Sequence, residues 1–211
     1  MKKRGDMVLE PLSKTIQGVI NITWPMVLIS VIVMVSFRTC YLVKNEEKIV
    51  LYKELCMLIF GIYILCLFQV VTFQDDVSLS GNNFIPFKEI LRYNVTSRLF
   101  IKNVLGNMIM FLPFGLFSSY YLKSEKITLP LLLTLITSLS IEFVQLSIGR
   151  VFDVDDIILN LLGGIFGYFI YRILHSIGKL FPVSCKKEWV LNSLAIFILT
   201  GLIISLVLIM T

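Results

Sequence analysis

The sequence has 211 residues, of which 57% are hydrophobic and 16% are charged, and it carries a formal net charge of +5. Soluble globular chains hold roughly 45–50% apolar and about 25% charged residues, so this composition excludes a soluble globular fold and indicates a protein in lipid. The excess of lysine and arginine needs only anionic membrane lipids as partners, and no nucleic acid.

Six stretches are long and apolar enough to cross a bilayer, whose core requires about 20 mostly apolar residues per helix. They are Ile20–Phe37, Leu55–Phe73, Val104–Leu122, Ile127–Ile148, Ile157–Leu174 and Val190–Met210. Only helices satisfy their own backbone polar groups in lipid, so we predict an all-α bundle of about six transmembrane helices. The first stretch is the weakest, because Asn21, Thr23 and Pro25 lie near its start, and a helix lying in the interface is its alternative.

Residues 74–102 form the only long connection between these stretches. Pro86 can open a helix at its first position. Apolar residues then recur at helical spacing, at Phe87, Ile90, Leu91 and Val95. This pattern predicts a short amphipathic helix on the membrane surface, and a solvated loop with one helical turn is an equal alternative.

Polar residues gather at the start of the third stretch, the end of the fourth and the start of the fifth. An ionisable group inside a span is costly, so such residues indicate function. Alternation of antiparallel helices brings the three ends to one leaflet, and spacings of three and four place each set on one helical face. The residues are Asn103 and Asn107, Glu142 and Gln145, and Asp153, Asp156 and Asn160. We predict a pocket at one membrane face, with Arg150 at its rim.

Two kinds of chemistry fit such a pocket. Carboxylate and amide oxygens suit a divalent cation such as Mg²⁺, Mn²⁺ or Ca²⁺, for which Glu142, Asp153 and Asp156 are the candidate ligands. A carboxyl in a partly dry pocket can act as a general acid or base, and these three are the candidate catalytic groups, Glu142 first. The alternative is a buried hydrogen-bond network that locks the helices together. We prefer that alternative for Asp155, which we expect to be an exposed turn residue.

Glycines continue the polar stripe of the fifth stretch. Gly163 and Gly167 form a small-xxx-small pair, which predicts close packing against another helix. Pro113 predicts a kink in the third stretch that widens the pocket. The four cysteines and the single histidine, His175, show no metal or redox pattern.

Loop charges give a weak indication of orientation. The face with the N-terminal tail and the long connection carries nine lysines and arginines, against ten on the other face. Setting the tail aside leaves five against ten, which favours the long connection outside the cell under the positive-inside rule.

Three strings carry a family resemblance. NFIPFKEI, then NVLGNMIMFLPFGLF, then IEFVQLSIGRVFDVDDIILNLLGGIFGY resemble the VanZ-like family of small bacterial membrane proteins, from about Ile49 to about Arg172. The name-giving member is associated with teicoplanin resistance, so the resemblance implies a multi-pass protein of the bacterial plasma membrane with a role in the cell envelope. It also implies that the pocket faces outside. The expected substrate-binding residues are Asn83, Asn103, Asn107, Gln145, Arg150 and Asn160.

We divide the chain by this resemblance. Residues 1–48 hold a tail and an extra span, residues 49–172 the VanZ-like core of four spans, and residues 173–211 a linker and the last span. The first hypothesis is a protein that binds or modifies a lipid-linked or cell-wall precursor, and whether it is an enzyme is left open. A transporter or flippase needs polar residues through the depth of the membrane, whereas these cluster in one leaflet. A scaffold or regulator that docks through its glycine faces is the third hypothesis.

Overall fold

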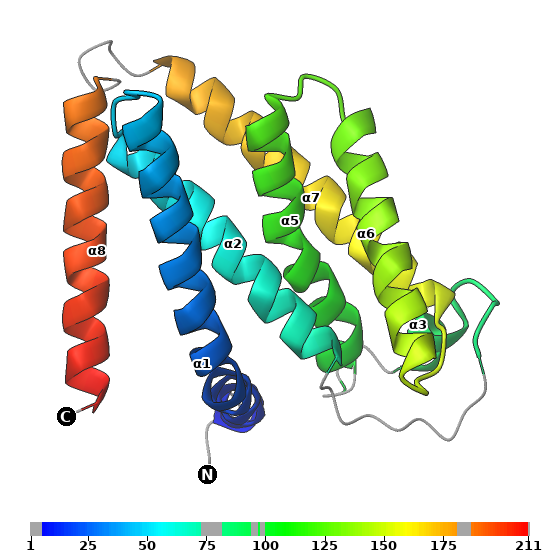
Figure 1. The fold of residues 1–211 in the computed structure, drawn as a ribbon. Helices are drawn as coiled ribbons and strands as arrows, with labels where there is room; N and C mark the ends of the chain where they lie inside the picture. The colour runs from blue at the N-terminus through cyan, green and yellow to red at the C-terminus, as the bar shows by residue number, and fades with distance from the viewer. Residues whose placement is uncertain (1–5, 73–81, 94–96, 98–99, 181–186, 211) are drawn as a thin grey trace. The chain divides into compact units, whose positions relative to one another are not determined.

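The structure, a computed structural model, describes residues 6–72, 82–93, 97, 100–180 and 187–210. Within these residues all regular elements are helical, and one isolated parallel bridge pairs Asn83 with Asp153. In chain order the elements are α1 (Asp6–Lys44), α2 (Leu51–Thr72), α3 (Lys88–Arg92), the π-helical η1 (Ile101–Leu105), α5 (Gly106–Leu122), α6 (Thr128–Ser147), α7 (Val154–Leu180) and α8 (Glu188–Met210) (Figure 1). The predicted all-α class is confirmed.

Five helical segments of the described chain are long and apolar enough to cross a membrane. They are Trp24–Lys44, Leu51–Val70, Asn103–Leu122, Thr128–Ser147 and Val154–Lys179. The first therefore has the length of a full span, as predicted, although it begins and ends later along the chain. The sixth predicted span falls on α8, a helix of 23 residues that is apolar along most of its length. The protein is a multi-pass membrane protein.

The helices form two compact units. The first unit comprises Met1–Val19 and Leu67–Ser176, and the second comprises Ile20–Cys66 and Ile177–Thr211. Each unit is a set of segments that pack against one another. The predicted domain boundaries at residues 48 and 172 rest on the family resemblance and stay a prediction.

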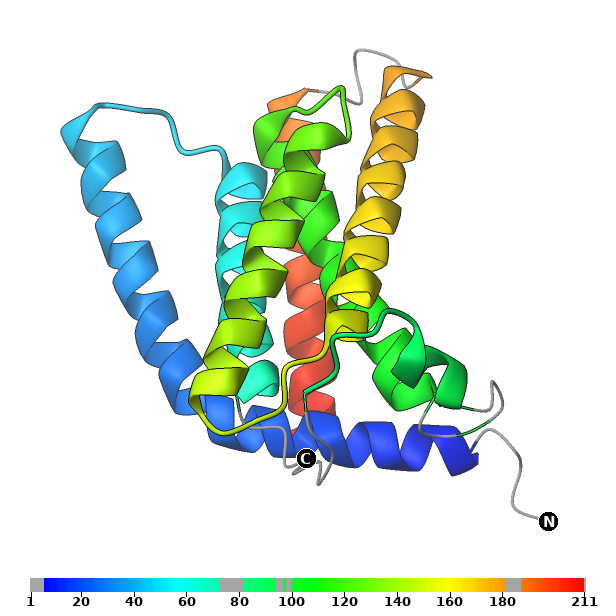
Figure 2. The ribbon, with the colours of Figure 1, turned by 90° about the vertical axis from the view of Figure 1, so that its right-hand side faces the viewer.

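Glycines bring the helices of the first unit close together. α5, α6 and α7 lie side by side (Figures 1 and 2). A Cβ atom added at Gly163 would lie 2.2 Å from the carbonyl oxygen of Met108, and one at Gly167 would lie 2.1 Å from that of Leu112, both on α5. On the neighbouring face of α7, a Cβ at Gly164 would lie 2.6 Å from Oγ1 of Thr134 on α6. The predicted close packing at the glycine pair is confirmed.

The long connection contains a shorter helix than predicted. α3 begins at Lys88, two residues after Pro86, and ends at Arg92. The residue before it, Phe87, has a left-handed backbone (φ 66°), which prevents the helix from starting earlier. Leu91 is 81% exposed, in agreement with an outward apolar face, and Val95 lies outside the described residues.

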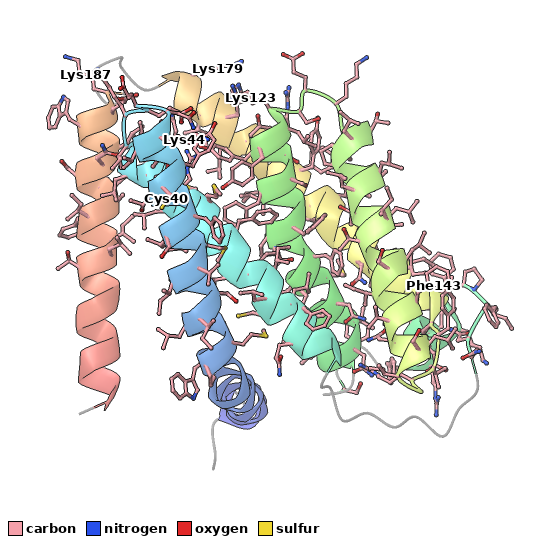
Figure 3. All side chains as sticks on the ribbon, in the orientation of Figure 1. Cys40, Lys44, Lys123, Phe143, Lys179 and Lys187 are labelled. Atoms are coloured by element: carbon pink, nitrogen blue, oxygen red, sulfur yellow. The ribbon has the colours of Figure 1, made fainter. Side chains whose placement is uncertain are left out.

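The second unit contains an ion pair between two of its helices. Arg38 of α1 donates two hydrogen bonds to the Glu54 carboxylate of α2, at 2.7 and 2.9 Å. The backbone N–H of Tyr52 donates to Oδ1 of Asn192 on α8 at 3.1 Å. Figure 3 labels Lys44, Lys179 and Lys187, which lie at one end of this unit. The first span runs from Trp24 to Lys44, so Arg38 lies within it. The sequence had instead predicted that this span ends at Phe37.

Candidate functional site

A cavity of about 260 Å³ lies in the first unit, where α3, η1, α5, α6 and α7 meet. All nine residues predicted from the sequence line this cavity: Asn83, Asn103, Asn107, Glu142, Gln145, Arg150, Asp153, Asp156 and Asn160. The structure thus brings together side chains that are up to 77 positions apart in the chain. Their catalytic and binding roles stay predictions.

The position of each residue around the α6 helix decides whether its side chain faces the cavity. Glu142 is 1% exposed and faces the cavity, whereas Phe143 beside it, labelled in Figure 3, is 61% exposed. Ser138 and Thr134, one and two turns earlier on the Glu142 face, are fully buried. The Glu142 face of α6 is therefore polar and buried against protein.

Asn83 closes the cavity by joining two segments. Its backbone N–H donates to the Phe152 carbonyl at 2.8 Å, and its own carbonyl accepts from the Val154 N–H at 3.1 Å. Its side-chain amide donates to Oδ1 of Asp153 at 2.8 Å. Figure 2 shows the segment before α3 running beside the segment before α7. Asn83, which is 4% exposed, therefore fixes the long connection to the start of α7.

Asp153 connects three parts of the site. Its Oδ1 accepts from the Asp155 N–H at 2.9 Å, which is the hydrogen bond of an N-cap residue at the start of α7. Its own N–H donates to Oε2 of Glu142 at 2.9 Å, linking α7 to the end of α6. Burial raises the pKa of Asp153 above its ordinary range, and the hydrogen bonds from Asp155 and Asn83 oppose that rise.

Asp155 corrects a prediction. We expected an exposed turn residue, but its side chain is 1% exposed. Its carboxylate accepts from the backbone N–H groups of Phe87, Glu89 (2.7 Å) and Ile90 (3.1 Å). The first N–H groups of any helix lack intrahelical partners, so Asp155 supplies the cap that α3 lacks locally. The expectation of exposure was wrong because the carboxylate faces a helix start and not water.

Glu142 is bound through amides. With the Gln145 amide assigned so that its nitrogen faces Glu142, Nε2 donates to Oε1 of Glu142 at 3.1 Å and Oε1 accepts from Nη1 of Arg150 at 3.0 Å. Arg150 therefore reaches Glu142 through Gln145. The chain of contacts from Arg150 to Asp153 runs along the end of α6 and the turn that follows.

Amides also contact the remaining carboxylate. Nδ2 of Asn107 donates to Oδ1 of Asp156. Asn103 instead donates to the Tyr93 hydroxyl at 3.0 Å, so the two asparagines take different partners although both line the cavity. Asn103 lies in η1, and π-helical turns recur at functional sites. Asn160 donates to the Ser138 hydroxyl at 2.9 Å.

The proposed metal ligands gain no geometric support. Among the residues that the structure describes, no group of three or more His, Cys, Asp or Glu side chains is arranged to hold a metal ion. Glu142, Asp153 and Asp156 line one cavity, but each takes hydrogen bonds from a different set of donors.

Four polar cavity residues in or next to α3 were not among those predicted from the sequence. Lys88, Glu89, Arg92 and Tyr93 also line the cavity. Arg92 pairs with Glu89 at 3.2 Å and its side chain is 67% exposed. The string NFIPFKEI pointed to this segment, but periodicity alone placed the helix on the membrane and not in the cavity wall.

A family model described as VanZ/LLP1 matches residues 55–175, more than half of the chain. The matched range includes every residue that lines the cavity. No curated protein and no solved structure matches the chain. The match confirms the resemblance carried by the three strings.

Proposed function

The chain belongs to the VanZ/LLP1 family, and on that premise we propose that it acts in the bacterial plasma membrane as a cell-envelope protein. Its cavity binds the polar end of a lipid-linked or cell-wall substrate. The association of the VanZ-like family with teicoplanin resistance supports this role and supplies a phenotype by which to test it.

One observation carries the proposal. A cavity of about 260 Å³ collects carboxylates, amides and cations from five helical elements at one end of a membrane bundle. Ionisable groups at membrane depth are costly, and concave sites with a few convergent polar groups are where small ligands bind. The volume suits a headgroup or a short polar moiety.

The chain's own residues divide into two roles in this proposal. Glu142, Asp153 and Asp156 contact the substrate, with Glu142 as the candidate acid or base if the substrate is modified. The amides of Asn103, Asn107, Gln145 and Asn160 orient the substrate beside Arg150, while Asn83 holds the long connection over the cavity.

The test is a pair of isosteric substitutions, Glu142→Gln and Asp156→Asn, in a strain lacking the native copy. Membrane abundance and teicoplanin susceptibility are measured together. Glu125→Gln is the matched control, because Glu125 is exposed on the turn between α5 and α6. We expect normal abundance and lost protection for the two cavity variants, and normal values for the control. Normal abundance with full protection would contradict the proposal.

A scaffold is the second candidate, and a specific observation favours it. Asp153, Asp155 and Glu142 all accept hydrogen bonds from backbone N–H groups, as structural carboxylates do. If Glu142→Gln and Asp156→Asn both lose abundance in proportion to protection, the carboxylates serve the fold and the scaffold replaces the binding role.

A further inference from the structure

The cationic side chains that line the cavity are more exposed than Glu142 in its interior. The cationic side chains of Lys88 and Arg92 are exposed, that of Arg92 by 67%. Arg150, on the turn after α6, is half-buried and also lines the cavity. Glu142, by contrast, is 1% exposed. Glu89 pairs with Arg92 at 3.2 Å, so the mouth carries three cationic side chains against one carboxylate and is net positive, whereas the interior holds carboxyl groups.

The interior offers more acceptors than donors. Within the described residues, Glu142, Asp153 and Asp156 take hydrogen bonds from amides and backbone N–H groups. Asn160, which also lines the cavity, leaves Oδ1 as a buried acceptor without a partner in the described part of the chain. Buried carboxylates are stabilised by a cationic partner, and an occupant that brings donors would supply one.

The arrangement favours an organic cation over a metal. A metal ion needs several oxygens converging at about 2.0–2.6 Å, and the described part of the chain has no such group. A primary ammonium has three N–H donors that reach separate acceptors. Arginine and lysine at the mouth suit a phosphate, which arginine binds in a bidentate manner.

We propose that the cavity binds a zwitterionic aminoalkyl-phosphate headgroup. Its primary ammonium points inward to Glu142, Asp153 and Asp156, and its phosphate lies at the mouth, beside Lys88, Arg92 and Arg150. This inference rests on the proposed function and names the class of substrate for the same site.

The test uses the purified full chain in detergent and follows its thermal unfolding during titration with short-chain lipids. Phosphatidylethanolamine has a primary ammonium, phosphatidylcholine has a quaternary one without N–H donors, and phosphatidylglycerol has none. We expect phosphatidylethanolamine to bind about tenfold or more tightly than the other two, since charge-assisted hydrogen bonds distinguish it. Equal binding of the three lipids would overturn the proposal.

Two variants locate the binding. Asp156→Asn should remove the preference for phosphatidylethanolamine, and Glu125→Gln should retain it. Lys88→Ala changes an exposed side chain and tests the mouth without disturbing the interior. It should weaken phosphatidylethanolamine and phosphatidylglycerol alike, whereas Lys126→Ala, an exposed lysine on the turn between α5 and α6, should weaken neither. A preference for phosphatidylethanolamine that survives in Asp156→Asn would overturn the assignment, and so would affinities for both lipids that are unchanged in Lys88→Ala.

Glycerophosphoethanolamine, the headgroup without acyl chains, distinguishes the source of the ligand. Competition at similar strength supports the headgroup class with a soluble source, and competition at least tenfold weaker supports it with a membrane source. If lipid preference is absent but Glu142→Gln still loses protection at normal abundance, the inference fails and the proposed function stands. If both results are negative, both fail.

Discussion

The two units of this protein place charge inside their helices in different ways. In the second unit, Arg38 and Glu54 form a bidentate pair, so each charge has an opposite charge as its partner. In the first unit, Glu142 and Asp156 take hydrogen bonds from neutral donors. A paired charge is complete without a ligand, whereas an unpaired carboxylate in a cavity is a place for one.

The two units also differ in what their glycines pack against. A Cβ added at Gly61 in the second unit would meet the flexible side chain of Met34, at 2.9 Å from its sulfur. A Cβ added at Gly167 in the first unit would lie 2.1 Å from a backbone oxygen, that of Leu112. Backbone cannot move aside as methionine can. The unit that holds the cavity is thus the one with rigid helix contacts, which is what a preorganised site requires.

The largest expected effect is on stability, when alanine replaces a glycine at a helix contact of the first unit and the same change is made in the second unit for comparison. Gly167→Ala should destabilise the protein by about 3 kcal/mol or more, at or above the upper end of overpacking costs, because α5 must move away. Gly61→Ala should change stability by less than about 1 kcal/mol, since Met34 can change rotamer. Folded yield and thermal unfolding in detergent measure both. Gly178→Ala, at a position on α7 with nothing within 4 Å, is the control. Equal losses at Gly167 and Gly61 would remove the distinction between the units.

The next largest effect compares Asp155, whose carboxylate accepts hydrogen bonds from backbone N–H groups, with Glu54, whose carboxylate accepts them from an arginine side chain. Asp155→Ala leaves the backbone N–H groups of Phe87, Glu89 and Ile90 without their acceptor and should cost roughly 3 kcal/mol. Glu54→Gln keeps a hydrogen-bonding group beside Arg38 and should cost less. Limited proteolysis should cut Asp155→Ala within residues 82–93 first. Cleavage elsewhere in that variant would contradict the capping role.

The convergence of the polar residues followed from the sequence by simple geometry. Antiparallel helices alternate direction, so the end of one span and the start of the next share a membrane face. Spacings of three and four residues then placed Glu142 with Gln145, and Asp156 with Asn160, on single faces. The structure puts all four in one cavity.

What periodicity could not show were the partners of backbone groups. Asp155 binds N–H groups 65 to 68 positions earlier in the chain, and no local pattern encodes such a pairing. The same holds for Arg38, whose acid partner lies 16 residues away on the next helix, so a charge that read as the end of a span lies within it. Asn83 entered the sequence prediction through the family resemblance alone.

The smallest expected effect concerns pH and sharpens the contrast in charge pairing. Burial raises the pKa of Asp153, so the folded state holds its proton at a pH where the unfolded chain has lost it. Stability from this group is then present at acid pH and lost as pH rises through the raised value. Relative to Asp153→Asn, the wild-type protein should gain stability on acidification toward the ordinary aspartate range, by less than about 1 kcal/mol because solvent screens a half-buried group. Unfolding in detergent across that pH range measures the difference. A relative loss on acidification would mean that hydrogen bonds from Asn83 and Asp155 outweigh burial, and that Asp153, like Glu54, has its negative charge satisfied within the protein.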